Sequence, residues 1–600
     1  MILSALNDYY QRLAEQGRVP TPGFSSEKIS FALVFSREGM PLQINDLRHT
    51  DGKKPRPRSM QVPVDKRRTS GIHAYGLWDK TAYALGVTAG EGKRLAEEHG
   101  AFQMRQRALL AASETPALNA FLRLMELWTP DQLKSLAGYS DDILDSNVVF
   151  RLDGERYFLH EYPEARQRWE AVMESDEGLI GQCLVTGEIA PMGTGHPAIR
   201  EVNGAQSSGA SLISFNSDAY ESYGQKGQAN AAISKKAIFG YATALNYLLR
   251  RDNDNHQRLQ IGDATVVFWA NASDAIQADA AHTFFFSILN DPPTDEQEAA
   301  RLKTALERIA QGSALADTDL GLRGDTEFFV LGLAPNAARL SVRFWCVNTL
   351  DQLTRHVAMH QQDLTLLPSP WKGGLSPLWR LLYATAPSRD GKAKAEDIPP
   401  QLAGEMARAI FTGRRYPQSL LSHLVMRFRN DGDISGIRIA LCKAILSRNA
   451  RLASSRFSSQ EVPVSLDPHS THPGYLLGRL FAELERAQRG ALGDQLNATI
   501  RDRYYGAASA TPASVFPMLL RNVQHHLSNM RKKDKGGLAT VIEREMTAII
   551  GGLGECFPRS LRIEDQGRFA IGYYHQSQAR FAKRDTDTPT EDVATQGEEA

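Results

Sequence analysis

The sequence has few cysteines, and none of them has the spacing of a zinc-binding pair. The four are Cys183, Cys346, Cys442 and Cys556, and no two of them form a C-x-x-C motif. Structural zinc sites draw on closely spaced pairs, so this scatter argues against a zinc knuckle. We expect all four to be buried, reduced thiols of a protein from a reducing compartment.

Long apolar runs are also missing. A membrane-spanning helix needs about 18 or more consecutive apolar residues, and no segment approaches that length. The N-terminus, MILSALNDYYQRLAEQG, has neither a basic n-region nor a cleavage site, and its apolar residues recur at helical spacing instead. These features favour a soluble, cytoplasmic protein that has no membrane partner.

The known catalytic and phosphate-binding motifs are absent as well. We find no G-x-x-x-x-G-K-[ST] loop, no G-x-S-x-G elbow and no H-E-x-x-H helix. Other polar groups are better explained as helix starts, surface histidines or turn residues. These groups are His160, Glu161, Glu164, Asp263, Asp325, Glu327, His525 and His526. We therefore expect no enzyme activity, no metal and no cofactor.

The chain has no net charge, because 69 Lys and Arg balance 69 Asp and Glu, but the charges are unevenly distributed. Residues 53–68, KKPRPRSMQVPVDKRR, hold seven basic residues and one acid. The prolines block a helix and predict an extended loop. Since no acids neutralise its charges locally, the loop can follow a phosphate backbone, and His73, Tyr75 and Trp78 can face bases. A solvated surface is the alternative.

A second basic stretch covers residues 401–460, with ten Lys or Arg and three acids. Within it, GIRIALCKAILSRNARLASSRF predicts an amphipathic helix whose cations lie off the apolar face. Such a helix suits a groove for a single strand or a heteroduplex. The expected groove residues are Arg414, Arg415, Arg427, Arg429, Arg438, Lys443, Arg448 and Arg451.

Hydrophobic periodicity predicts an α+β fold. The expected elements are a hairpin of residues 28–35 and 40–47, helices over 93–180, a helix from residue 233, a buried strand over 263–270, and a hairpin of 326–333 and 338–345. Beyond residue 347 strand signals fade, and five amphipathic segments near the end predict an antiparallel helical bundle. The predicted domains are a mixed α/β domain (1–346), a basic helical region (347–472), the bundle (473–584) and an acidic disordered tail (585–600).

The segment GAQSSGASLISFN, residues 204–216, is rich in small polar residues. Its strand-like end and its coupling to the next helix argue against a free linker. We expect a loop near DNA or the guide, with Gln206, Ser207, Ser208, Ser211 and Asn216 as donors. The alternative is a buried structural loop whose polar side chains satisfy backbone groups.

Several long runs of the sequence resemble the large subunit of the type I-C CRISPR surveillance complex, Cascade. The runs are MILSALNDYYQRLAEQG, GAQSSGASLISFNSDAYESYGQKGQANAAISKKAIFGYATALNYLL, RLQIGDATVVFWA, FFVLGLAPNAARLSVRFW, PGYLLGRLFAELERAQ and QGRFAIGYYHQSQ. They occur in order from residue 1 to about residue 584. Runs of this length are far more specific than a short motif.

The resemblance implies a subunit without catalysis, located at the foot of a crescent that backbone subunits build along a guide RNA. It implies that the protein inspects duplex DNA for a protospacer-adjacent motif (PAM), helps to open the duplex and recruits a helicase–nuclease. The other implied partners are the Cascade backbone and guide-processing subunits. Small residues and amides suit an approach through the minor groove. The expected DNA-contacting residues are Lys53, Lys54, Arg56, Arg58, Lys66, Arg67, Arg68, Ser70, Gln206, Ser207, Ser208 and Asn216.

Two further points follow from the resemblance. Members of this family carry a Pro-x-Phe pattern after the segment that reads RTSGI here, whereas this chain reads HAYG, so its PAM preference cannot be carried over from relatives. The family also implies a separately translated C-terminal small subunit. Because no Met lies between Met426 and Met518, that product would need a non-AUG start near Val462, Val464 or Leu466. A guide-processing endoribonuclease and a generic RNA-binding scaffold remain as alternatives.

Overall fold

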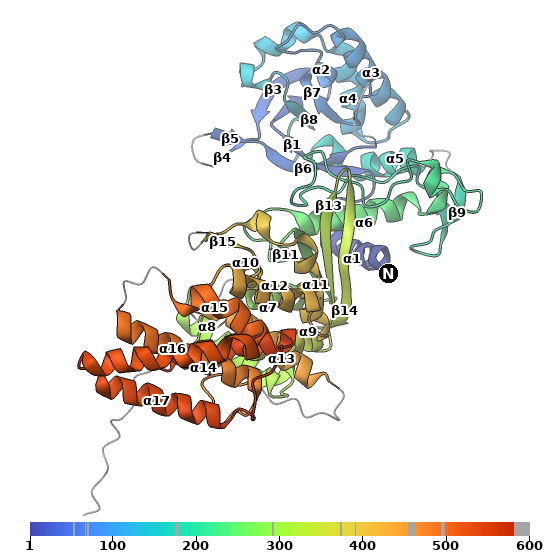
Figure 1. The fold of residues 1–600 in the computed structure, drawn as a ribbon. Helices are drawn as coiled ribbons and strands as arrows, with labels where there is room; N and C mark the ends of the chain where they lie inside the picture. Colours follow the sequence, from blue (N-terminus) through green and yellow to red (C-terminus); the bar gives the residue numbers. More distant parts are fainter. Residues whose placement is uncertain are drawn as a thin grey trace, which may run out of the picture. The chain divides into compact units, whose positions relative to one another are not determined.

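The computed structural model describes residues 1–51, 54–65, 68, 71–174, 179–290, 293–371, 375–389, 392–453, 462–493 and 498–580 (Figure 1). The chain forms two compact units. The first unit comprises Met1–Ile199 and Ser211–Tyr247, and the second comprises Arg200–Ala210 and Leu248–Ala600. Of the predicted segments, the tail over 585–600 lies outside the described residues.

A four-stranded sheet in the order β3-β2-β8-β7 forms the centre of the first unit. Its elements and their neighbours are α1 (Ile2–Glu15), β2 (Phe31–Phe35), β3 (Pro41–Asp46), β7 (Trp78–Lys80), α2 (Thr81–Ala84), α3 (Leu95–Leu109), α4 (Pro116–Leu127), β8 (Asn147–Leu152), α5 (Pro163–Glu174), β9 (Ile180–Gln182), β10 (Ile189–Pro191) and α6 (Lys235–Leu249). The β2–β3 pair is antiparallel, which confirms the first predicted hairpin.

Strand β8 was not expected, because residues 93–180 were predicted to be mostly helical. It lies parallel to β2, and its Phe150 ring contacts Phe102 of α3 and Phe121 of α4, at centroid distances of 6.0 and 4.6 Å. The β-branched pair Val148 and Val149 is completely buried. A strand buried on both faces has no alternating pattern, so its sequence cannot be told from a short buried helix.

A separate antiparallel ribbon pairs β1 (Phe24–Ile29) with β6 (Arg58–Pro63), and a short hairpin pairs β4 (His49–Asp51) with β5 (Lys54–Arg56). The backbone over residues 54–63 is extended, as predicted for the loop over residues 53–68, but β5 and β6 are paired strands, which was not predicted. Two of the prolines occur at places that strands tolerate: Pro57 lies between the two strands and Pro63 ends β6.

The second unit contains a four-stranded antiparallel sheet in the order β11-β12-β13-β14. Its strands are β11 (Arg258–Ile261), β12 (Ala264–Asn271), β13 (Glu327–Asn336) and β14 (Arg339–Thr349). The buried strand and the hairpin predicted here are both confirmed, since every residue of β12 except Asn271 is buried.

Helices make up most of the rest of this unit. They are α7 (Ala275–Leu289), α8 (Glu296–Ala310), α9 (Leu350–Asp363), α10 (Leu378–Tyr383), α11 (Pro400–Thr412), α12 (Gln418–Asn430), α13 (Gly436–Arg451), α14 (Pro473–Leu492), α15 (Ile500–Ala510), α16 (Pro512–Lys532), α17 (Gly536–Gly551) and α18 (Ile563–Gln578). The α+β class and the packed helical C-terminal region are confirmed. No helix among the described ranges is long and apolar enough to cross a bilayer.

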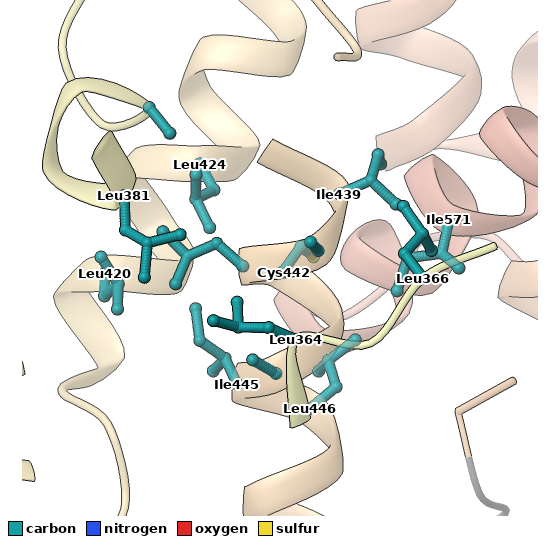
Figure 2. Packing of buried hydrophobic residues seen from close by; sticks show 14 of the residues in the cluster. Leu364, Leu366, Leu381, Leu420, Leu424, Ile439, Cys442, Ile445, Leu446 and Ile571 are labelled. Carbon is teal, nitrogen blue, oxygen red and sulfur yellow. The ribbon is translucent and has the colours of Figure 1, made fainter. Parts of the chain in front are cut away.

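One hydrophobic core runs through this unit from Leu259 in the sheet to Tyr574 in α18. Figure 2 shows a part of it, in which Leu364, Leu424, Cys442 and Ile571 are labelled members of the same cluster. The sheet therefore shares its core with the helices that follow, whereas the sequence assigned it to the N-terminal domain. The boundary predicted near residue 472 marks a change of pattern, and the packing runs across it.

Three of the cysteines are buried, but Cys556 is exposed, so the expectation of burial is wrong for that residue. The Cys183 thiol accepts hydrogen bonds from the backbone N–H groups of Val185 (3.4 Å) and Ser234 (3.3 Å). Burial alone would raise the pKa of Cys183, but hydrogen bonds from Ser234 and Thr186 outweigh it and lower the pKa to about 7. Cys183 thus joins two segments of the first unit.

Helices α14 and α18 approach closely because glycines lie at their crossing. A Cβ atom at Gly478 would meet the carbonyl of Phe569, and one at Gly572 would meet the carbonyl of Tyr475. We expect Gly478→Ala or Gly572→Ala to lower the free energy of unfolding by about 1–3 kcal/mol, because the helices must separate to admit a methyl group. Urea denaturation measures this loss.

The matched control is Gly551→Ala in α17, where a Cβ atom would have nothing within 4 Å. It should be neutral or slightly stabilising, since alanine favours helix more than glycine does. Equal stability losses at Gly551 and Gly478 would contradict the argument from close approach.

Candidate nucleic-acid interface

The β1–β6 ribbon presents a polar face that carries positive charge. Lys28 lies opposite Ser59 and Ser26 lies opposite Gln61, and the Ser26 and Ser59 hydroxyl oxygens are 2.8 Å apart. Lys28, Ser26 and Ser59 are exposed. Directly opposed residues of an antiparallel pair share one face of the ribbon, so these side chains form one patch of donors.

Two predicted DNA-contacting residues are exposed close to this patch along the chain. Arg58, at the start of β6, lies opposite Ile29, so its side chain belongs to the other face of the ribbon from Lys28 and Ser59. Arg56 is exposed at the end of β5, where it pairs with His49 of β4. We call Lys28, Arg56, Arg58 and Ser59 the basic ribbon. Lys28 was missed because a single lysine in SSEKIS is unremarkable until the strand pairing places it beside Ser59.

The other basic residues predicted in this segment cannot all be placed. Lys53, Lys66, Arg67 and Ser70 lie outside the described residues, and Lys54 is described only as part of strand β5. Their contacts with phosphates stay predictions.

Arg68 occupies a place that differs from the prediction. Its guanidinium lies 2.7 Å from both carboxylate oxygens of Asp79 and stacks on the rings of Tyr75 and Tyr83, at 4.3 and 3.9 Å. Asp79 is completely buried, and it also accepts the backbone N–H groups of Tyr75 and Lys80. Burial raises the pKa of Asp79, and the Arg68 guanidinium opposes that shift. Arg68 therefore stabilises the fold through Asp79, and its contact with phosphate stays a prediction.

The aromatic residues that follow Arg68 are also structural. The Trp78 indole N–H donates to the Pro63 carbonyl at 2.7 Å, and its buried ring stacks on Tyr75 at 4.9 Å. His73 is held by Asp65 at 2.9 Å, and Arg105 contacts the same carboxylate. The expectation that Trp78 can face a base is wrong, because its ring lies in the core.

The segment over 204–216 belongs partly to each unit. Its residues up to Ala210 are part of the second unit, and its residues from Ser211 onward are part of the first unit. A turn closes it where the Gly209 N–H donates to the Gln206 carbonyl at 2.9 Å. The strand-like end forms no regular strand over residues 212–216. The predicted donors Gln206, Ser207, Ser208 and Asn216 are exposed, and their contact with DNA stays a prediction.

In the second basic region, the buried carboxylate of Asp431 forms ion pairs with two arginines. Arg427 lies 3.2 Å from it and Arg438 lies 2.8 Å from it. Arg438 also donates to the carbonyls of Ala384 and Ala386, each at 3.1 Å. These bonds tie α12 and α13 to the end of α10.

A second buried residue, Asp363 at the end of α9, binds the remaining basic residues of α13. Arg448 lies 3.1 Å and Arg451 lies 2.7 Å from its oxygens, and Lys443 donates to its backbone carbonyl at 3.1 Å. The Arg448 guanidinium also lies 4.3 Å from the centre of the Tyr416 ring. Each cation therefore has a partner inside the unit.

The expectation that the cations of α13 face outward is wrong for Arg438, Lys443 and Arg448, which are 2%, 4% and 1% exposed. The predicted groove residues that remain exposed are Arg414, Arg415, Arg429 and Arg451. Of these, Arg415 donates to the Leu452 carbonyl at 3.0 Å, so it lies beside the end of α13.

Burial or pairing accounts for three of the groups considered for catalysis. His160 is buried, and burial lowers its pKa to about 3. Hydrogen bonds from Thr115 and Arg168 lower the pKa of Glu164 to about 2, and Asp263 pairs with Arg343 at 2.6 Å. Across the described ranges, no three His, Cys, Asp or Glu residues gather as metal ligands would.

A comparison with protein families matches this chain over residues 6–581 to a family described as CRISPR-associated protein (Cas_Csd1). The match covers both units and includes the basic ribbon and all the helices of the second unit. No curated protein sequence matches the chain.

Proposed function

The chain belongs to the Cas_Csd1 family of CRISPR-associated proteins, the large subunits of type I-C Cascade, and we propose that it senses the PAM of target DNA in that complex. In this proposal the protein binds a guide-containing assembly, supports R-loop formation and recruits a helicase–nuclease. It performs no catalytic step itself. Base pairing with the guide reads the remaining sequence, by analogy with other guide-dependent effectors.

The observation that carries the proposal is the basic ribbon. Arg56, Arg58 and Lys28 are exposed on strands whose backbone is fixed by pairing, so their charges face a ligand from a rigid support. Hydroxyls at Ser26 and Ser59 lie on the same face of the ribbon as Lys28 and can donate to phosphate or groove atoms.

We expect the double variant Arg56→Ala, Arg58→Ala to bind PAM-containing duplex more weakly than wild type. The slope of log K against log salt should fall by about 0.9 for each phosphate that the variant no longer neutralises, because fewer counterions are released. Duplex-binding titrations with the assembled complex, at several salt concentrations and with PAM and PAM-free targets, measure both quantities.

The matched control is Arg323→Ala, which removes an exposed arginine of the second unit. It should leave the slope unchanged. PAM-independent binding by wild type, together with an unchanged slope in the double variant, would make this chain a passive scaffold.

Four predicted groove residues that remain exposed in the second unit support binding of a single strand or heteroduplex: Arg414, Arg415, Arg429 and Arg451. Of these, Arg415 also donates to the Leu452 carbonyl and Arg451 pairs with Asp363. The alternative of a guide-processing ribonuclease requires a general acid and base. Incubation with guide precursor separates the two, because only the ribonuclease cleaves it.

A separately translated small subunit is also part of the proposal. Mass spectrometry of the assembled complex should find a C-terminal product that begins near Val462, Val464 or Leu466. Such a product would lack α12 and α13, whose buried residues share the core with α18. We therefore expect it to be stable only when bound in the complex. A complex that contains only the 66.4 kDa chain would contradict this expectation.

A further inference from the structure

A crevice of about 170 Å³ opens between α14, α15 and α16, the helices so labelled in Figure 1. Its base is apolar and buried, formed by Leu484, Leu519 and Val523. Pockets for drug-sized ligands have volumes of about 300–1,000 Å³, so this crevice suits something smaller.

The mouth of the crevice is polar and aromatic. Tyr504 is half-buried and gives it an aromatic wall, while Arg503 and Asn522 are exposed beside it. Within the described part of the chain, these three side chains have no hydrogen-bond or ion-pair partner. They differ in this respect from Arg438 and Arg448, whose donors are taken by carboxylates and carbonyls.

The segment from Arg503 to Lys533, which includes α16, carries no negative charge, although the exposed Asp502 directly precedes Arg503. Between Asp502 and Asp534 the chain has five Lys or Arg and no Asp or Glu. Helix α16 consequently has no acid along its whole length, and its exposed Arg521 precedes Asn522 at the crevice. A surface of this kind attracts a phosphate backbone.

We propose that this crevice holds one unstacked base of a single-stranded nucleic acid. The base would stack on Tyr504, its edge would bond the Asn522 amide, and its phosphate would meet Arg503. An apolar floor, one aromatic wall, an amide and a free guanidinium are the groups that sequence-tolerant single-strand sites combine. This inference rests on the nucleic-acid binding proposed above, but it concerns a different surface from the basic ribbon.

The test compares an oligothymidine strand with an abasic strand of the same length, using fluorescence anisotropy and the full chain. Stacking on an aromatic side chain predicts that the thymidine strand binds about tenfold more tightly. Tyr504→Leu should lower the affinity for the oligothymidine strand to that for the abasic strand. Tyr383→Leu, which removes a half-buried tyrosine elsewhere in the same unit, should preserve the difference. An oligouridine strand should behave like oligothymidine, because the crevice contacts the base.

Arg503→Gln provides a variant that cannot fail through unfolding, since its side chain is exposed and unpaired. This variant should weaken the binding of both strands equally, and it should lower the slope of log K against log salt by about 0.7. Equal affinity of wild type for the two strands, or a difference that survives Tyr504→Leu, would overturn the inference. PAM-dependent duplex binding is measured separately, so its persistence would show that only the crevice assignment has failed.

Discussion

Arg68→Ala is expected to lower the free energy of unfolding of the first unit by about 3–5 kcal/mol, because it leaves the buried Asp79 carboxylate without its cation. The variant also removes the guanidinium from the Tyr75 and Tyr83 rings. Unfolding in urea, followed by near-ultraviolet circular dichroism, measures the loss.

The matched control is Arg58→Ala, which removes an exposed arginine of the same segment. It should change stability by no more than about 0.5 kcal/mol. The two variants should therefore separate by mechanism, with Arg68→Ala losing stability and Arg58→Ala losing affinity for DNA. An Arg68→Ala protein with wild-type stability and weakened DNA binding would instead assign Arg68 to phosphate.

Asp363→Ala is expected to destabilise the second unit by about 3–5 kcal/mol, because it leaves the buried Arg448 without a counter-charge. Arg451 loses the same partner but is partly exposed, so water can solvate it. The measurement is urea denaturation of the full chain, monitored by hydrogen exchange of α9 and α13 amides.

Asp325→Ala provides the comparison, since its carboxylate is exposed and pairs with the exposed Arg323. Surface pairs of this kind contribute about 0–1 kcal/mol, so this variant should remain close to wild type. A similar small effect at Asp363 would mean that water reaches the cluster around Arg448.

The pairing partners of these arginines explain why sequence reasoning misplaced them. Arg448 is 85 residues from Asp363, and Arg438 is 52 residues from the carbonyl of Ala386. A local count of charges in residues 401–460 therefore missed Asp363 and the Ala386 carbonyl, and it could not show that Asp431, which it included, pairs with Arg427 and Arg438. The prediction from amphipathicity that the cations of α13 face outward failed for the same reason. An arginine that is paired with a distant carboxylate can occupy a buried position.

Elements that depend on neighbouring residues were predictable. The hairpin of β2 and β3, the buried strand β12, the hairpin of β13 and β14 and the C-terminal helices all follow from periodicity and turn residues. The runs that resemble the type I-C large subunit also identified the family, which the match over residues 6–581 confirms.

The sequence by itself thus determined the fold class, the strands β2, β3, β12, β13 and β14, the C-terminal helices, and the family. Only the tertiary structure decided which cations face solvent, that β8 joins the sheet, and that Lys28 lies beside Ser59. The physical reason is that periodicity is a local property, whereas the pairing of strands and the desolvation of a charge depend on residues distant along the chain.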